Sequence, residues 1–327
     1  MSDVIPELQA THTRRSPVFV IGYPRSGTSI ICRLMRRYLK VSFGTESQFI
    51  IRYHRALDRY GDLGDDANVH RLISDISRER FFVRSGRNWG FVFDPVRAAG
   101  AVRTRTYAGV LDAIFGQLAA HNGMDRWGDK TPQYNDDLGV LRQLFPDAQF
   151  VHMVRDGRDV SLSIRLTGFG PKNACECAED WANALASIDA FTRQLPPDQF
   201  LEVRYEDLTK DPSATLERLG RFLGIDDADG RVASYIRAHV TAEIKSNNSE
   251  KWRRALPAGE IARFEGVAGS WLARYGYALV HEGAAPVPGV AARAYWRARG
   301  RLTRLTNRGY WQDNLYKLRL LIQRAPR

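Results

Sequence analysis

A short stretch near the start of the chain combines glycines, hydroxyl side chains and an arginine in a pattern that suits phosphate binding. Gly22, Gly27, Thr28 and Ser29 keep the spacing of the loop G-x-x-x-x-G-K-[ST], but Thr28 stands where that loop has its lysine. Arg25, inside the loop, supplies positive charge instead. Backbone N–H groups and a helix N-terminus favour an anion. The pattern therefore predicts a site for a phosphate compound other than ordinary ATP or GTP, although a strand–turn–helix connection without a ligand would use the same residues.

A second group of charged residues follows another apolar run. Arg155 comes directly after Phe150–Val154, and Ser163 lies about two turns into the next helical segment. Arg155 would lie beside the first loop if the two strands are neighbours, because ligands of open α/β sheets bind at the carboxyl ends of the strands. Its guanidinium group can bind phosphate through two hydrogen bonds. Asp156 offers the alternative of a magnesium ligand, which the missing loop lysine disfavours, and a surface Arg–Asp cluster at a helix start is also open.

The elements that must position these residues alternate between strands and helices. We expect three strands, each followed by a helix, which indicates a parallel sheet with right-handed crossovers in a P-loop-like α/β/α fold of three layers. The expected pairs are Pro17–Gly22 with Thr28–Tyr38, Ala148–Val154 with Asp159–Leu166, and Gln199–Arg204 with Tyr205–Leu223.

A large helical insertion separates the first two of these strands. The patterns in it predict helices over Phe49–Tyr60, His70–Phe82, Thr104–His121 and Asn135–Leu144, with Asn135 as N-cap, a short strand over Arg126–Lys130, and loops over Gly61–Asp66 and Ser85–Asp94. Cys177–Gln194 and Pro257–Tyr275 also have helical patterns. We expect the insertion to build the substrate pocket.

The end of the chain differs in composition from the rest. The net charge is +11, and beyond Gly283 ten basic residues face only Asp313, so residues 1–283 are nearly neutral. Trp311, Leu315, Leu318 and Ile322 fall at helical spacing there. We expect one main domain over 1–283 and a basic helical extension over 284–327. The extension suits packing onto the body, a second subunit in a homodimer, or an anionic membrane surface.

Composition excludes several classes of protein. The apolar content of 44% is ordinary for a globular chain, and three cysteines are too few for a disulfide framework. Without a long apolar run or a signal-peptide pattern, we expect a cytoplasmic protein, with membrane association through the extension as an alternative. The near-neutral body argues against specific nucleic-acid binding.

Several motifs together give the chain a family resemblance. The lysine-less loop and the R-x7-S pair Arg155 and Ser163 resemble the sulfotransferases that use 3′-phosphoadenosine 5′-phosphosulfate (PAPS), whose donor carries phosphate at both ends of its ribose. Further matching segments, in order, are Gly128–Pro132 (D-K-x-P), Val203–Leu208 (Y-E-D-L), Asp211-Pro212, Phe222–Gly224, Lys251–Arg253 and Leu272–Tyr277. The chain resembles most the branch with protein-tyrosine and bacterial sulfotransferases.

The resemblance implies a role for each matching residue. The first loop would hold the 5′-phosphosulfate, Arg155 and Ser163 the 3′-phosphate, and Glu46, shortly after the first helix, would be the general base. Arg25 and Lys130 would stabilise the leaving phosphate, so the expected catalytic residues are Glu46, Lys130 and Arg25. The expected donor-binding residues are Arg25, Ser26, Gly27, Thr28, Ser29, Arg155, Ser163, Tyr205, Lys251 and Trp252.

The implied reaction is in-line transfer of the sulfuryl group of PAPS to an acceptor hydroxyl, which leaves adenosine 3′,5′-bisphosphate (PAP). No metal is expected, since fixed positive groups would take the part of magnesium. The acceptor is a glycan, a lipid or another alcohol. A P-loop nucleotide kinase or phosphotransferase is the alternative. Without the family, Glu46 fits a salt-bridged or capping carboxylate, and Lys130 a partner for a nearby aspartate.

Overall fold

The computed structural model describes residues 12–13, 15–244, 248–281, 285, 287–306 and 311. The chain divides into two compact units. The first contains residues up to 22, 27–154 and 188–246, and the second contains 23–26, 155–187 and 247–327. The division falls inside the lysine-less loop, so residues 23–26 belong to the second unit while the flanking glycines belong to the first.

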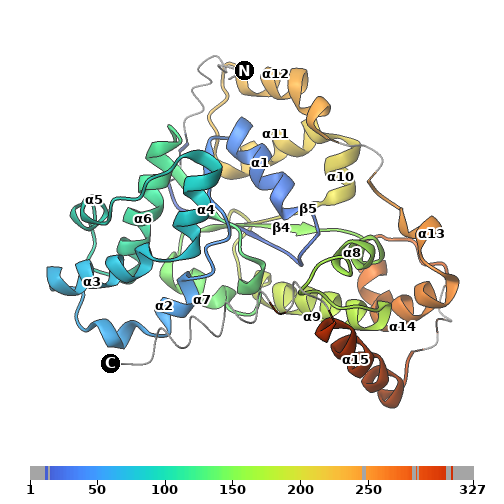
Figure 1. Ribbon diagram of the computed structural model, residues 1–327. Coiled ribbons are helices and arrows are strands. Elements are labelled where there is room, and N and C mark those ends of the chain that lie inside the picture. The colour runs from blue at the N-terminus through green and yellow to red at the C-terminus, as the bar shows by residue number, and fades with distance from the viewer. Residues whose placement is uncertain are drawn as a thin grey trace. The chain divides into compact units, whose positions relative to one another are not determined.

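The first unit contains a five-stranded parallel sheet (Figure 1). Its strands are β1 (Val18–Ile21), β2 (Val41–Phe43), β3 (Arg126–Asp129), β4 (Gln149–Val154) and β5 (Phe200–Arg204), in the order β2-β3-β1-β4-β5. β1 pairs with β4 from Val18 opposite Gln149 to Ile21 opposite His152. The predicted parallel α/β sheet is therefore confirmed, and the strands before the two anion-binding motifs are neighbours.

The two faces of the sheet bury alternate residues of each strand, as strands require. Phe19 and Phe150 lie in a core with the helices of the insertion, and Val20 and Met153 lie in a core on the other face. The helices of that other face are α1 (Thr28–Tyr38), α10 (Tyr205–Lys210), α11 (Pro212–Leu223) and α12 (Arg231–His239), with the 3₁₀ turn η3 (Val240–Glu243). The sheet is covered on both sides, which explains its nearly continuous apolar strands.

The insertion consists of short helices around an aromatic cluster. Its elements are α2 (Ile50–His54), η1 (Leu57–Tyr60), α3 (Asp66–Ser77), α4 (Arg80–Trp89), α5 (Pro95–Gly100), α6 (Tyr107–His121), η2 (Pro132–Tyr134) and α7 (Leu138–Leu144). The ring of Phe115 stacks on Trp127 with centroids 4.5 Å apart and on Phe49 at 5.8 Å. This packing links the insertion to β3.

Four expectations about the insertion are wrong. The helix expected over Phe49–Tyr60 is the short helix α2 followed by the 3₁₀ turn η1. The helix expected over His70–Phe82 is two helices that break at Arg78 and Glu79, and the loop expected over Ser85–Asp94 begins as the second half of α4. Asn135 is not the N-cap of α7, because Asp137 holds that position.

The second unit consists of helices. It contains α8 (Gly157–Ile164), most of α9 (Ala174–Thr192), α13 (Trp252–Ala255), α14 (Ala258–Arg274) and α15 (Val290–Leu305). No helix in the described ranges is long and apolar enough to span a bilayer. The expected stripe at Leu315, Leu318 and Ile322 lies outside the described residues. The expected boundary at Gly283 remains a prediction, because 282–284 also lie outside them.

Candidate active site

The loop between β1 and α1 has the backbone that a phosphate-binding turn needs. Gly22 and Gly27 have φ values of 143° and 98°, and Arg25, which is not a glycine, has a φ of 74°. Three positive φ values within six positions bend the chain sharply. The two glycines adopt them without steric cost, whereas Arg25 stores strain of the kind found at functional sites. Gly27 is the N-cap of α1 without a side-chain cap, so the first N–H groups of the helix keep their capacity to donate.

Both glycines of this loop are also required by their neighbours in the first unit. A Cβ on Gly22 would lie 2.4 Å from the backbone oxygen of Met153, and one on Gly27 would lie 2.6 Å from Cδ2 of Tyr205. Tyr205 is buried, with its ring against Gly27. The side chain that we expected at the nucleotide thus packs directly beneath the loop.

Asn135 fixes the start of the loop. Its side-chain oxygen accepts from the N–H of Gly22 at 3.4 Å, and its side-chain nitrogen donates to the carbonyl of the same residue at 3.0 Å. One amide side chain therefore satisfies both polar groups of the Gly22 backbone. This contact replaces the capping role expected for Asn135, and the sequence spacing of 113 residues gave no signal for it.

Glu46 and Lys130 form an ion pair in the first unit. Lys130 Nζ lies 2.7 Å from Glu46 Oε1, and their side chains are 15% and 29% exposed, respectively. Gln48, at a φ of 56°, donates to the other carboxylate oxygen of Glu46 at 3.3 Å. Two residues predicted separately as base and phosphate-stabilising cation therefore meet, and Lys130 has taken Glu46 as partner rather than an aspartate.

A buried hydrogen-bond network adjoins this pair. The Ser47 hydroxyl donates to Asp129 Oδ2 at 3.0 Å, and the Ser47 N–H donates to the Thr131 hydroxyl at 3.0 Å. The hydroxyl of Tyr134 lies 3.0 Å from that of Ser47 and accepts from the backbone of Ile50. The residues that flank Glu46 and Lys130 are thus bonded to each other, which fixes the ion pair in place.

Asp129 is the charged member of this network. Burial raises the pKa of its carboxyl to about 6, although hydrogen bonds from Thr131 and Ser47 and the nearby charge of Lys130 act in the opposite direction. In the sequence, Asp129 is part of the D-K-x-P segment, and we expected no role for it there. The sequence did offer one signal: Asp129 and Thr131 are two residues apart on an extended segment, so their side chains lie on the same face.

The second unit brings Arg25 together with Arg155 and Ser163. Arg25 Nε donates to the Ser163 hydroxyl at 2.8 Å, and Arg155 Nη1 lies 3.5 Å from the carbonyl oxygen of Arg25. Arg155 Nη2 also donates to the carbonyl of Asn248 at 2.5 Å. Arg25 is exposed, whereas Arg155 is only 6% exposed. Residues from both predicted anion-binding motifs thus form one cationic cluster within this unit.

Ser26 lies in the same unit, and its buried hydroxyl has no hydrogen-bond partner among the described residues. A buried hydroxyl without a partner is costly, and a ligand oxygen would remove that cost. Thr28 is buried and Ser29 exposed at the start of α1. The donor-binding residues expected at the loop are therefore spread over its length.

Trp252 is held by two consecutive residues of α8. Its backbone N–H donates to Asp159 Oδ1 at 3.0 Å, and the Arg158 guanidinium lies 3.6 Å from its ring centroid. Lys251, the preceding residue, is exposed. The segment predicted to close over a nucleotide is thus anchored to the helix that carries Ser163.

Asp156 does not have the surroundings of a magnesium ligand. One carboxylate oxygen accepts from the backbone N–H and from Nε of Arg158, and the other accepts from Nη2 at 2.8 Å. Arg158 also pairs with Glu265 at 2.6 Å. Asp156 therefore caps α8 and neutralises a buried arginine. In the described ranges, no three His, Cys, Asp or Glu side chains gather as metal ligands.

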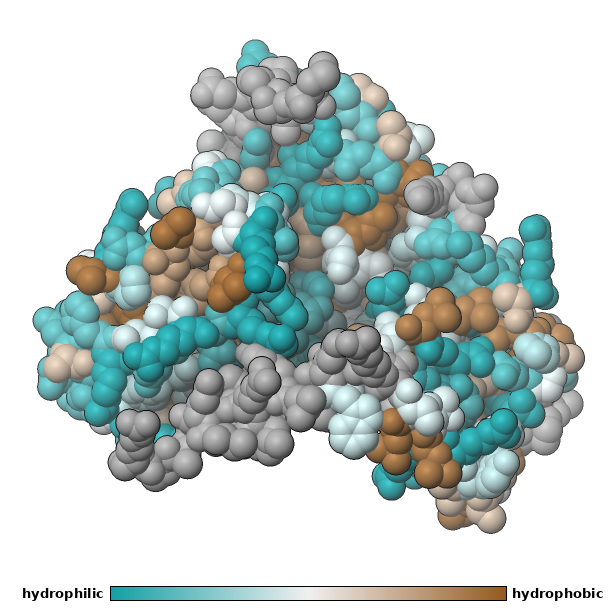
Figure 2. All heavy atoms as spheres, viewed as in Figure 1, coloured by the Kyte–Doolittle hydropathy of each residue, from teal (hydrophilic) through white to brown (hydrophobic). Residues whose placement is uncertain are grey.

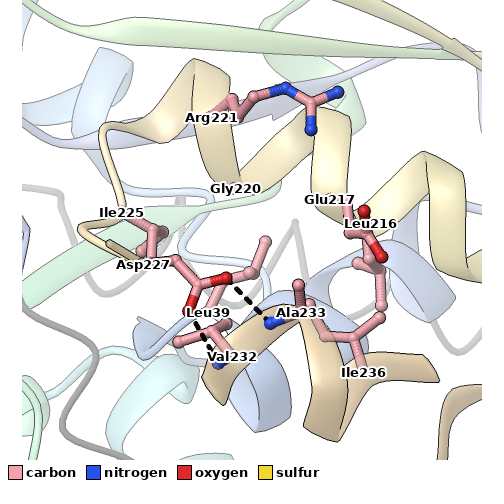
Figure 3. Close-up of a pocket in the computed structure, with 10 residues that line it drawn as sticks. All are labelled: Leu39, Leu216, Glu217, Gly220, Arg221, Ile225, Asp227, Val232, Ala233 and Ile236. Atoms are coloured by element: carbon pink, nitrogen blue, oxygen red, sulfur yellow. Dashed lines mark hydrogen bonds between the residues drawn. The ribbon is translucent and has the colours of Figure 1, made fainter. Parts of the chain in front are cut away.

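A small pocket in the first unit lies away from these residues (Figure 3). Leu39 at the C-terminal end of α1 lines it together with residues of α11 and α12, whereas the loop between β1 and α1 lies at the other end of that helix. Asp227 accepts from the N–H groups of Val232 and Ala233 there (Figure 3). The pocket contains none of the residues that the sequence predicted to bind or react.

Comparison with known proteins identifies a family. A model described as "Sulfotransferase family" matches residues 17–229. Protein-tyrosine sulfotransferase A of Caenorhabditis elegans is 24% identical over 81% of this chain and 68% of its own length. Protein-tyrosine sulfotransferase 1 of Danio rerio is 25% identical over 80% of this chain and 72% of its own. The solved sulfotransferase domain from the curacin biosynthetic pathway is 20% identical, covers 81% of this chain and 99% of that domain, and has a TM-score of 0.48.

Proposed function

Since the chain belongs to the sulfotransferase family, we propose that it transfers the sulfuryl group of PAPS to the hydroxyl group of an acceptor. The observation that carries the proposal is the meeting of Glu46 and Lys130 at 2.7 Å, next to residues that hold both in place. A carboxylate and an ammonium group, partly exposed, are what proton removal and leaving-group stabilisation require.

The donor is bound by the loop, by Arg155 directly after β4, and by Ser163 of α8. The N–H groups and hydroxyls of Ser26, Thr28 and Ser29 bind the 5′-phosphosulfate, together with the Arg25 side chain. Arg155 and Ser163 bind the 3′-phosphate. The bond between Arg25 and Ser163 supports this role, because a phosphate that accepted from both would replace it with stronger charge-assisted bonds.

Three further residues complete the donor site. Tyr205 supports the loop from beneath and borders the nucleotide, since its ring already defines the position of Gly27. Trp252 and Lys251 form the closing segment, with Lys251 directed to a phosphate. The contacts of Trp252 with Arg158 and Asp159 support this role because they fix the segment beside the helix that carries Ser163.

The reaction balances through one proton transfer. The acceptor hydroxyl gives its proton to Glu46 while its oxygen forms a bond to sulfur. The bond from sulfur to the bridging oxygen breaks, and its electron pair stays on the 5′-phosphate of PAP. When Glu46 becomes neutral it no longer attracts Lys130, so the ammonium group is released at the moment when charge develops on the phosphate. Arg25 stabilises the same charge.

The alternative of a P-loop kinase has less support. A magnesium ligand at the end of β4 would have to be Asp156, but its carboxylate oxygens accept hydrogen bonds from Arg158. The position of the loop lysine is occupied by Thr28. We expect PAP to bind in the presence of EDTA. In a separate assay with magnesium and no EDTA, we expect magnesium ATP not to compete with PAP.

The acceptor bears a hydroxyl group and is proposed to be a glycan, a lipid or another alcohol. The helical insertion is the segment in which acceptor groups would be recognised, because it leads from Glu46 to Lys130. A screen of these acceptor classes with ³⁵S-labelled PAPS identifies the product.

The decisive experiment is Glu46→Gln with the acceptor found in that screen. The variant keeps the shape and a hydrogen bond to Lys130 but cannot take a proton, so we expect turnover to fall by about 10²–10⁴-fold with PAP affinity retained. Glu217→Gln is the matched control, because Glu217 is also ion-paired, with Arg237 at 2.7 Å, and comparably exposed. Full turnover in Glu46→Gln would remove Glu46 as the base.

A further inference from the structure

The helix α15 is attached to the second unit through its polar side. Arg297 Nε lies 2.7 Å from Glu179 Oε2, and Asn173 donates to the carbonyl of Trp296 at 2.9 Å. The Trp296 ring lies under the Arg263 guanidinium at 4.9 Å. Gly300 is buried so closely against Glu176 that a side chain would collide with its carboxylate. The attached face of α15 therefore rests on ion pairs and a glycine.

The opposite face of α15 is apolar and exposed. Residues that follow one another at spacings of four and three form this face, and they are Ala291, Tyr295, Ala298, Leu302 and Leu305. The exposed fractions are 57% for Tyr295, 66% for Leu302 and 46% for Leu305. Figure 2 shows brown surface over α15 beside teal. We call these five residues the outer face.

This arrangement is the reverse of that in an ordinary surface helix, whose apolar side faces the protein. Arg299 and Arg301 border the outer face, and both are exposed. An apolar stripe flanked by arginines is the pattern of a helix that lies in the interface of an anionic bilayer. We propose that the outer face of α15 docks the protein onto an anionic lipid surface.

The charge of the whole extension favours lipid over a second copy of the chain. Beyond Leu305 the sequence carries five more basic residues and only Asp313 as an acidic one. Two copies that met at the outer face would bring arginines of both together, and like charges oppose such contact. An anionic bilayer instead attracts each of these cations and accepts the apolar side chains.

The test uses the full chain and floating vesicles. We expect binding to vesicles of phosphatidylcholine with phosphatidylglycerol, weaker binding to phosphatidylcholine alone, and loss of the difference at high salt. Leu302→Glu removes a large apolar side chain from the centre of the outer face. Thr303→Glu, the matched control, adds the same charge at the next residue, which is exposed but lies off that face.

Because both variants add one negative charge to α15, their comparison separates an effect at the outer face from a general loss of attraction to the anionic surface. We expect Leu302→Glu to weaken vesicle binding by about tenfold more than Thr303→Glu, from the partition of one leucine side chain. Equal binding by the two variants, or no binding of the unaltered chain to anionic vesicles, would overturn the proposal. So would a dimer, seen by sedimentation, that Leu302→Glu dissociates.

The proposal does not rest on sulfuryl transfer, and its failure is distinguishable from failure of that function. Both substitutions are at exposed positions outside the donor site, so PAP affinity and the thermal midpoint are expected to stay unchanged in both. Loss of vesicle binding with retained PAP binding assigns the defect to the outer face.

Discussion

The buried carboxyl of Asp129 should make the stability of the protein depend on pH in an identifiable way. Its side chain is almost fully buried, and burial raises its pKa from 3.8 to about 6. At a pH between these two pKa values, the carboxyl is protonated in the folded protein but has released its proton in the unfolded chain. Stability contributed by Asp129 is present below pH 3.8 and is lost as the pH rises to about 6. A shift of this size corresponds to about 3 kcal/mol.

The perturbation is Asp129→Asn, which stays neutral at every pH and keeps an oxygen to accept from Ser47. Urea unfolding, followed by tryptophan fluorescence in steps from acid to weakly alkaline pH, gives the free energy of unfolding of both proteins. The free energy of unfolding of the unaltered protein, relative to that of the variant, should fall by about 3 kcal/mol as the pH rises through this window. Most of the change should be complete near neutrality. Asp125→Asn, which removes a half-exposed carboxylate from the same segment, is the control.

Parallel curves for the unaltered protein and Asp129→Asn would refute the reasoning. They would mean that the hydrogen bonds from Ser47 and Thr131 outweigh burial and keep the carboxylate charged throughout the window. If the free energy of unfolding of the unaltered protein instead rose with pH relative to that of the variant, the carboxylate would also be charged. In that case its charge would stabilise the hydrogen-bond network.

Two further predictions concern the donor site. Gly27→Ala should destabilise the protein by about 1–3 kcal/mol and weaken PAP binding, because the residue has a φ of 98° and its Cβ would lie 2.6 Å from Tyr205. The control is Gly139→Ala in α7, whose Cβ would meet no described atom within 4 Å, so its thermal midpoint should be unchanged or higher. A lower midpoint for Gly139→Ala than for Gly27→Ala would contradict this prediction. Arg155→Ala should weaken PAP binding, measured by calorimetry, by about 10–100-fold, because a charged hydrogen-bonding partner is lost. The control is Arg165→Ala at the end of α8, which breaks an ion pair with Glu260 and should leave PAP affinity unchanged. Equal affinities of the two variants would show that Arg155 does not bind the 3′-phosphate.

Much of the fold could be predicted because its signals are local. The strands β1, β4 and β5 are continuous apolar runs, and the helices after them have clear periodicity. β2 was missed because a strand of three residues has no detectable period, and its pairing with β3 depends on residues more than eighty positions away. The second half of α4 was missed because Ser85, Gly86 and Asn88 favour loops, whereas the burial of Phe81 and Phe82 stabilises a helix there.

The candidate site was predictable as a list of residues but not as a set of contacts. Glu46 and Lys130 were named for separate reasons, and nothing in the sequence shows that they form an ion pair. The contact of Asn135 with Gly22 and that of Ser47 with Asp129 are tertiary hydrogen bonds between distant segments. Such bonds depend on how the helical insertion returns to the sheet, which no local pattern records.

The bonds from Ser47 to Asp129 and Thr131 have a consequence for how such a chain can change over evolution or by design. They join the segment before α2 to the end of β3 and the segment after it, and they do not involve the side chains of the helices between these segments. Substitutions in those helices at positions outside the core that covers Phe19 and Phe150 would therefore leave the Glu46–Lys130 pair on its own supports. New acceptor preferences could then arise while the residues proposed to carry out the reaction stay unchanged.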